Sequence, residues 1–384
     1  MGRSYIQATS TLSTLHQMSS TTERALMPAE PVAGARNLLE KCMGLAPGHQ
    51  LLIVAEPDGS GHYDAALAPF IAQQATSLGA KVAVQTLAPG KGPEDVPDFL
   101  FEAIGAASHT LFLNRIGDQL RFRPLPGAGV KSISYTLDMG YLGSAFAVAP
   151  HRALEELHRR VLARLAASTR YSIRCALGSS LSMDCGALLQ SLGSVGGFTV
   201  QNFPVMIVPP VPADRLNGRL VLSHALTSTG IHEYPGSIIR LTSPITLTLI
   251  DGQITSLEGE SALLAQVEAQ LDRVDTLFGG AGRRLGSWHT GINPFTYFLT
   301  PALADLDRWS GVSFGSPRYT HFHLCGEPPG DICGQMFDAT ITFDDTVIWD
   351  RGRLALLDAP ENADILAELR ASAGSIGAPL PLGV

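Results

Sequence analysis

The 384-residue sequence has little charge, few cysteines and no long apolar run. Charged residues make up 16% of the chain and the formal net charge is −8, which argues against nucleic acid or an anionic membrane as the main partner. The five cysteines form no C-x-x-C pair, so reduced thiols in a cytoplasmic protein are expected. No stretch approaches about 18 apolar residues, and the first 30 lack the apolar core of a signal peptide, so no membrane segment is predicted.

Complete cofactor and hydrolase motifs are also missing. The glycines of residues 59–66 follow an apolar run but do not complete a G-x-G-x-x-G loop. The Gly-Lys of residues 88–95 is not followed by the Ser or Thr that opens the helix of a phosphate loop. There is no G-x-S-x-G elbow. Dinucleotide cofactors and serine hydrolysis are therefore not predicted.

The chain is rich in apolar residues, since 45% of its residues are hydrophobic. A chain of this length is expected to form two domains and to bury its cores without disulfides or structural zinc. Low charge density in so apolar a chain favours a surface hidden by self-association. We therefore expect a homo-oligomer.

The first half alternates between the periods of helices and strands. Apolar runs predict strands, and amphipathic stretches between them predict helices. Such alternation is typical of a parallel sheet covered on both faces. The predicted strands are 49–56, 81–87, 109–115 and 132–140, and the predicted helices are 35–45, 62–80, 94–107 and 151–168.

The second half is rich in strands. Alternating segments predict strands at 171–178, 218–226, 243–259, 296–300 and 339–356, with one helix at 261–279. Asp-Gly at 251–252 and Arg-Gly at 351–352 are typical of hairpin turns. The fold class expected is α/β: an N-terminal arm (1–34), a parallel-sheet α/β domain (35–168) and a β-rich α+β metal-binding domain (169–384).

The histidines of the second half carry the chemical signal. His321 and His323 are two apart in an apolar run, and side chains two apart on a strand share a face. Such a pair gives a metal two imidazoles from a rigid backbone. The alternative is a pair of hydrogen-bonded core histidines.

His289 adds a third imidazole from a glycine-rich segment, where Gly286, Gly291 and Pro294 indicate a sharply turning backbone. Asp338 adds a carboxylate. Such a ligand set suits one divalent transition metal with open positions, namely Mn, Fe, Co or Zn. Asp344 and Asp345 are interpreted as turn residues.

Several segments together resemble the thermophilic metalloaminopeptidase (aminopeptidase T and S) superfamily, which also contains 2,5-dihydroxypyridine dioxygenase and 5-nitroanthranilate aminohydrolase. The similar segments are 35–56, 203–210, 217–222, 285–294, 320–327 and 336–354. The resemblance implies a metal-dependent enzyme that assembles into oligomers.

Departures from the family pattern reduce the number of reactions that the sequence favours. Val205 and Ser287 stand where the peptidases place glutamates, so a two-metal peptidase centre is disfavoured. Met336 stands where the family has the histidine of a His-x-Asp that ends at Asp338, which weakens a ferrous dioxygenase site.

With the peptidase and dioxygenase sites disfavoured, the resemblance implies hydrolytic deamination of a nitro-activated aromatic amine, of the 5-nitroanthranilate type, and Mn is the favoured metal. The alternatives are an iron ring-cleavage dioxygenase of a dihydroxypyridine, a metalloaminopeptidase, or a non-enzymatic binding protein in which the histidines do not converge.

Glu327 is the candidate for proton transfer. The substrate-binding candidates are Arg283, Arg284 and Arg318 for a carboxylate, with Ser287, Asn293 and Tyr297; Phe295 and Trp288 are further candidates for the ring pocket.

Overall fold

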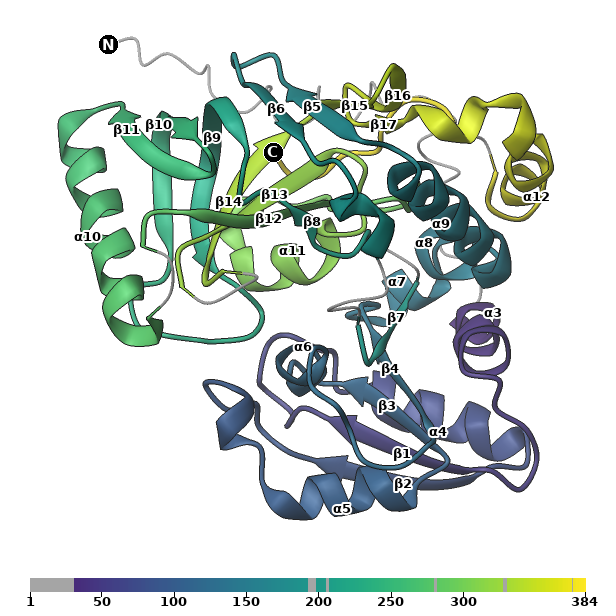
Figure 1. The fold of residues 1–384 in the computed structure, drawn as a ribbon. Helices are drawn as coiled ribbons and strands as arrows, with labels where there is room; N and C mark the ends of the chain where they lie inside the picture. The colour runs from purple at the N-terminus through teal and green to yellow at the C-terminus, as the bar shows by residue number, and fades with distance from the viewer. Residues whose placement is uncertain (1–30, 193–197, 205–206, 280–281, 327–329, 375) are drawn as a thin grey trace, which may run out of the picture.

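The computed structural model describes residues 31–384 apart from 193–197, 205–206, 280–281, 327–329 and 375. Most of the predicted arm, as well as Val205 and Glu327, lies outside the described residues. The fold is α/β as expected, with a small parallel sheet in one half and a large antiparallel sheet in the other (Figure 1).

The first half builds a five-stranded parallel sheet in the order β2-β1-β3-β4-β7. The inner strands are nearly continuous apolar runs because helices cover both faces, whereas β2 at the edge is largely accessible. Its elements are β1 (Gln50–Ala55), β2 (Lys81–Thr86), β3 (His109–Leu113), β4 (Val130–Ser134), α4 (Leu67–Ser77), α5 (Asp98–Ala106) and α6 (Ile116–Leu120).

The predicted first helix is divided into α3 (Pro31–Arg36) and a π-helical stretch, η2 (Asn37–Cys42). It ends where predicted, since Gly44 adopts φ +66°, a conformation that glycine enters without a Cβ clash.

The chain crosses between the two sheets more than once. Helix α9 (His151–Ala166) buries Leu154, Leu157 and Val161 in the core of the large sheet. Strand β7 (Gln201–Phe203) then returns to pair in parallel with β4 in the small sheet. One division at residue 168 therefore does not describe how the two cores are built.

The large sheet has twelve strands with antiparallel pairing. The hairpin turns fall where predicted, because Asp251, Gly252, Arg351 and Gly352 all have positive φ. The strand predicted at 296–300 is wrong: this segment makes one isolated bridge, between Phe298 and Leu382.

The remaining elements complete the large sheet and its cover. They are α7 (Met139–Gly143), α8 (Ala145–Val148), β5 (Arg170–Arg174), β6 (Ser180–Asp184), β8 (Val211–Pro212), β9 (Asn217–Ser228), β10 (Ile239–Ile250), β11 (Gln253–Glu258), α10 (Ser261–Phe278), β12 (Leu285–Thr290), α11 (Leu306–Ser313), β13 (Tyr319–Leu324), β14 (Ile332–Phe337), β15 (Thr340–Phe343), β16 (Thr346–Asp350), β17 (Arg353–Leu354) and α12 (Ala363–Ala373).

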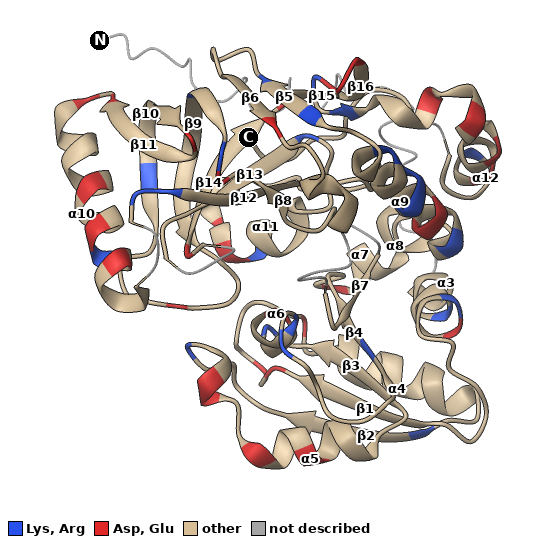
Figure 2. Ribbon diagram, in the orientation of Figure 1, with Lys and Arg blue, Asp and Glu red and all other residues tan. Residues whose placement is uncertain are grey.

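Strands β12, β13 and β14 present two different faces. One face, with Trp288, Phe322 and Met336, belongs to the main apolar core. The other is turned toward α11 and the parallel-sheet domain, and Tyr319 of this face packs in the core that joins the two domains. Charged residues lie mainly on outer helices such as α5, α9, α10 and α12 (Figure 2). The face turned toward the first domain is thus the place where buried polar side chains stand out.

Candidate metal centre

Three histidines meet on this inner face of β12 and β13. In the antiparallel register His289 lies opposite His321, and Ser287 lies opposite His323. Because side chains alternate along a strand, all four point to the same side of the sheet. His289 was expected in a sharp turn but lies within strand β12. The close backbone approach expected of its glycines occurs two residues later, just after β12. There a Cβ on Gly291 would lie 2.2 Å from the Gly315 carbonyl carbon.

The three imidazoles are close and almost completely buried. One nitrogen from each of His289, His321 and His323 lies within 4.8 Å of the other two. Ring centroids are 4.9 to 5.1 Å apart for the three pairs, and each residue is 3% exposed. Within the described part of the chain, these three histidines are the group of histidine, cysteine or acidic side chains whose ligand atoms lie close enough together to hold a metal ion.

Backbone carbonyls fix the orientation of two of these rings. Nδ1 of His289 lies 2.9 Å from the Val208 carbonyl, and Nδ1 of His323 lies 3.4 Å from the Gly330 carbonyl. A carbonyl can only accept, so each Nδ1 carries the proton and each Nε2 keeps its lone pair. Metal-binding histidines are commonly oriented in this way. Nε2 of His323 and Nδ1 of His321 are buried without a partner among the described residues.

Burial also keeps the three rings neutral. Desolvation is the main cause that holds the pKa of His289 and His321 well below the usual value, and it lowers the pKa of His323 to about 4. Repulsion from neighbouring imidazoles lowers the pKa of His289 and His321 further, and the positive charge of Arg121 acts in the same direction on all three rings. At neutral pH the cluster therefore offers neutral nitrogen donors.

Two further polar groups on this face have no partner. Gln335 of β14 lies opposite His321 and is completely buried, yet neither its amide oxygen nor its amide nitrogen makes a hydrogen bond within the described residues. The hydroxyl of Ser287 is in the same situation. Unsatisfied buried polar groups cost roughly 1–3 kcal/mol each, so their concentration here indicates a site built to meet a ligand.

Asp338 does not join the histidines, which corrects the expectation of a carboxylate ligand. Its carboxylate receives two hydrogen bonds of 2.8 Å from Arg318, and its side chain is 38% exposed. The physical reason is that β14 ends at Phe337, so Asp338 lies beyond the strand with a φ of +52°. Within β14, Met336 points into the core on the face opposite the histidines. Gln335 and Cys333 are the β14 residues that lie opposite His321 and His323.

The proposed arginines also lie elsewhere. Arg283 pairs with Asp272 at 2.9 Å on α10. Arg284 donates to the carbonyls of Asp214 and Asp251 and so ties two loops together. Neither is placed to bind a substrate carboxylate at the histidines.

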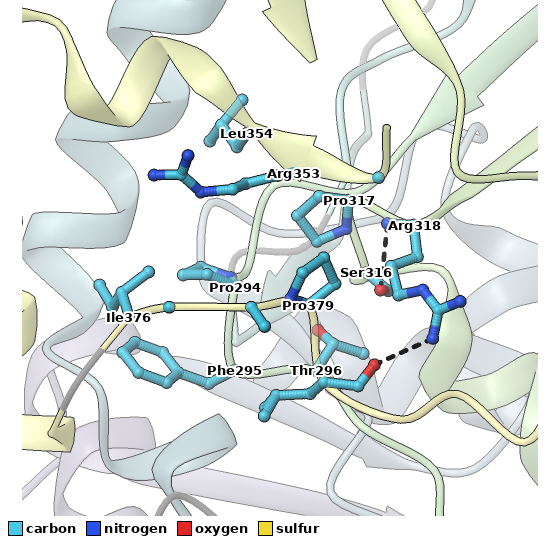
Figure 3. A pocket seen from close by; sticks show the side chains of 14 residues that line it. Pro294, Phe295, Thr296, Ser316, Pro317, Arg318, Arg353, Leu354, Ile376 and Pro379 are labelled. Carbon is cyan, nitrogen blue, oxygen red and sulfur yellow. Dashed lines mark hydrogen bonds between the residues drawn. The ribbon is translucent and has the colours of Figure 1, made fainter. Parts of the chain in front are cut away.

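Arg318 borders a small cavity that Pro294, Phe295 and Pro317 also line (Figure 3). Its backbone amide donates to Ser316 and its guanidinium donates to the Leu380 carbonyl, both drawn as dashed lines. The cavity has about 30 Å³, which is room for only about one or two water molecules. An aromatic substrate does not fit there.

The other predicted pocket residues have structural roles. Asn293 is fully buried, donates to the Phe146 carbonyl and accepts from the Phe295 amide. Tyr297 stacks on Tyr141 at 5.0 Å. Trp288 packs against Tyr171 and Phe343 on the far side of the sheet.

A cavity between the domains approaches the histidine face. It has about 180 Å³ and is lined by Asp118 and Gln119 from the parallel-sheet half and by Thr227 and Phe314 from the half with the large sheet. The Phe314 ring lies 5.0 Å from the His321 ring. Thr227 pairs with Cys333, which in turn lies opposite His323. Sequence patterns did not point to these residues, since no motif links residues 118–121 to the second domain.

The residues fit a borderline transition metal. Three neutral imidazole nitrogens, two of them oriented through their second nitrogen, suit Zn, Fe, Co or Mn better than the oxygen-seeking Ca or Mg. The absence of a carboxylate from the cluster, among described residues, departs from the two-histidine-one-carboxylate set of many non-heme iron enzymes.

Comparison with known proteins supports the fold. Neither a protein-family model nor a curated protein sequence matches the chain. Among solved structures, 2,5-dihydroxypyridine dioxygenase from Pseudomonas putida KT2440 is similar, with a TM-score of 0.55 and 15% sequence identity. The match covers 86% of this chain and 98% of that one. At this identity the likeness establishes a shared fold and leaves the reaction to be argued from the site.

Proposed function

We propose that the chain is a mononuclear metal enzyme that uses His289, His321 and His323 to hold one divalent ion and that oxidatively cleaves a small aromatic ring. The observation that carries the proposal is the buried cluster of three neutral imidazoles. The fold shared with a dioxygenase supports ring cleavage over the hydrolytic deamination expected from sequence. A redox-active ion such as iron(II) supplies the oxygen chemistry when bound.

The protein's own residues prepare the site. The carbonyls of Val208 and Gly330 hold two imidazoles in the tautomer that presents Nε2. The rings of Phe314 and Tyr319 both pack against the His321 ring, at 5.0 and 5.2 Å, and help keep water from it. Ser287 and Gln335 provide a hydroxyl and an amide that a polar ring substituent can satisfy.

Hydrolytic deamination is the second candidate, and one observation favours it. Three histidines without a carboxylate form the ligand set of carbonic anhydrase, which ionises water near neutral pH. A two-metal aminopeptidase centre is less well supported, since no carboxylate joins the cluster in the described part of the chain.

One pair of assays separates these reactions. Metal-free protein is loaded with Fe(II) or Mn(II) and mixed with 2,5-dihydroxypyridine in an oxygen electrode, or with 5-nitroanthranilate under argon. Oxygen uptake that disappears in His289→Ala supports ring cleavage. Ammonia release without oxygen supports deamination, and neither product with any metal contradicts the proposal.

Two further features belong to this proposal. Within the described residues no helix is long and apolar enough to cross a membrane. Separately, we propose a cytoplasmic location, because the five cysteines are free thiols. We also propose that it is a homo-oligomer, because the chain carries little charge for its apolar content. A monomer mass by light scattering at micromolar concentration contradicts the second point.

A further inference from the structure

His232 lies on the wall of the cavity between the domains. It belongs to the loop between β9 and β10, its side chain is 25% exposed, and it lines the cavity together with Thr227 and Phe314. The Phe314 ring packs against His321 at 5.0 Å, and Thr227 pairs with Cys333 of β14. The His232 ring therefore borders the space that reaches the edge of the histidine face.

The ring of His232 is held on two sides. Its Nδ1 lies 2.9 Å from Oδ1 of Asp331, whose side chain is 5% exposed. Because a carboxylate only accepts, Nδ1 carries the proton. Phe278 of α10 stacks on the ring at 4.8 Å. Nε2 lies 4.0 Å from Oε2 of Glu94, which is too far for a hydrogen bond, so this contact leaves its lone pair available.

Adjacent residues of one segment hold His232 and a histidine of the metal cluster. The Gly330 carbonyl accepts from Nδ1 of His323 at 3.4 Å. The next residue, Asp331, is the one that orients His232. Its backbone is fixed in turn, because its carbonyl accepts from the Tyr234 hydroxyl at 3.1 Å. The position of His232 is thus tied to that of His323 through covalently linked residues.

His62 also lines the cavity, but it is committed to a contact between the domains. Its Nδ1 lies 3.0 Å from Asp307 of α11, which also pairs with Arg115 at 3.3 Å. A Cβ on Gly311 would lie 3.0 Å from Nε2 of His62, so α11 covers that nitrogen. His232 is therefore better placed than His62 to exchange a proton with a ligand in the cavity.

The charges around His232 favour a protonated ring. The hydrogen bond to Asp331 is the main cause that raises the pKa of His232 above its usual value, and the charge of Glu94 adds to it, whereas burial and the charge of Arg123 oppose it. Among the described residues, the carboxylates that line the cavity are Asp118, Asp307 and Glu233. The first two accept hydrogen bonds from arginines, whereas Glu233 is exposed beside His232 in the sequence.

We infer that His232, oriented by Asp331, is the base that removes a proton from a hydroxyl of the substrate ring. This inference rests on the proposed function for the identity of the reaction. The O–H bond breaks, an N–H bond forms at Nε2, and the electron pair stays on the ring oxygen, so that an imidazolium and a phenolate face each other. An ionised hydroxyl makes the ring more electron-rich and easier to oxidise. Asp331 is a positioning residue, since it acts through His232 and stabilises the imidazolium.

The test uses a ring whose ionisation is visible. 4-Nitrocatechol absorbs at longer wavelength when one hydroxyl is ionised, and it is bound under argon to the full chain, metal-free and loaded with Mn(II). The pH is set about one unit below the pKa of the free probe, where only about a tenth of it is ionised. We expect about half or more of the bound probe to be ionised even without metal, because a neighbouring opposite charge lowers a pKa by about one unit or more.

Variants assign this ionisation to the pair. In metal-free protein, His232→Gln should return the ionised fraction of the bound probe to about a tenth, and Asp331→Asn should give an intermediate value. His49→Gln, which alters a histidine on the first domain whose Nδ1 accepts from Ala46, is the matched control and leaves the fraction unchanged.

The outcomes separate this inference from the proposed function. No binding of the probe, a neutral bound probe in metal-free protein, or equal ionisation in His232→Gln overturns the inference. Ionisation that needs Mn(II) and persists in His232→Gln also overturns it and leaves the metal site standing. Ionisation by His232 in a protein that binds no metal overturns the proposed function and leaves the base standing. If His232→Gln unfolds, as circular dichroism will report, Asp331→Asn decides, and a fraction identical to that of the unaltered protein counts against the inference.

Discussion

His289 and His321 lie directly opposite each other on neighbouring strands, with their rings stacked at 5.0 Å and only 9° from parallel. Such a pair is held by backbone register, because each residue is fixed by the hydrogen bonds of β12 and β13. His323 joins them from the next residue on the same face of β13. The metal ligands are thus carried by rigid strands, which favours a precise coordination geometry.

Replacing a histidine of the cluster should remove the metal. We expect His289→Ala and His323→Ala to lower the metal bound per chain from near one to near zero, because two imidazoles alone hold a divalent ion weakly. Metal analysis after dialysis measures this. His49→Gln, which alters a histidine on the first domain whose Nδ1 accepts from Ala46, should retain the metal. Full occupancy in both alanine variants contradicts the site.

Metal binding should release almost no protons from the cluster. Three ordinary histidines would carry about 1.5 protons in total at pH 6.5, but burial lowers the pKa of all three, to about 4 for His323. Calorimetric titration with metal at pH 6.5 in buffers of different ionisation enthalpy measures the protons released. A release near 1.5 protons shows that the rings are accessible to water and refutes the buried, neutral cluster.

The metal-free protein should also lose stability in mild acid. Because the pKa of each buried histidine is lower in the folded state than in the unfolded chain, the unfolded state binds more protons below pH 6.5. The free energy of unfolding therefore falls as the pH drops from about 6.5 toward 4. Bound metal should raise the free energy of unfolding by a similar amount at each pH between about 6.5 and 5, because binding to neutral imidazoles releases almost no protons, and urea titrations with and without metal will show this. Two curves that coincide argue against the triad as the metal site, and a gap that closes steeply over this range argues against neutral rings.

Replacing Gln335 should stabilise the metal-free protein. Both polar atoms of its buried amide lack partners in the described residues, so Gln335→Met removes a desolvation cost and should raise the free energy of unfolding by roughly 1–3 kcal/mol. Turnover should fall at least tenfold if the amide contacts substrate.

The matched control for this experiment is Gln270→Met. Gln270 is equally buried but donates to the Tyr234 hydroxyl, so its replacement should destabilise the fold. The opposite signs in thermal unfolding are the test, and destabilisation by Gln335→Met shows that its amide is satisfied in the folded protein.

Asp338 should be dispensable for metal binding. Its carboxylate pairs with Arg318 in a partly exposed position, so Asp338→Asn should cost only about 1 kcal/mol of stability and leave the metal content unchanged. Loss of metal in this variant, measured beside His323→Ala, restores Asp338 as a ligand.

The histidine pair and Asp338 show how much of the site can be predicted from the sequence. Period-two alternation predicted that His321 and His323 share a face, and that held because strand geometry is local. The prediction for Asp338 rests on a family motif instead, and the motif does not show that β14 ends at Phe337. One residue of offset turns Met336 into the core and Gln335 toward the histidines.

Contacts between the two halves of the chain could not be predicted from the sequence, for a different reason. Arg115 and Asp307, which form an ion pair at 3.3 Å, are 192 positions apart in the sequence, and neither period nor spacing connects the start of α6 with α11. The return of β7 to the parallel sheet is similarly invisible, because a strand of three residues, Gln201–Phe203, gives too short a pattern to assign. Alternating helices and strands, by contrast, predicted the parallel sheet itself.

The most direct test of the metal centre is X-ray absorption at the edge of the bound metal, with Fe(II) or Mn(II) loaded into metal-free protein. Multiple scattering from imidazole rings counts the histidines bound to the ion. Three imidazoles per metal, falling to two in His289→Ala if that variant is held in excess metal, is the result that the account predicts. One imidazole or none, with oxygen ligands in their place, contradicts it.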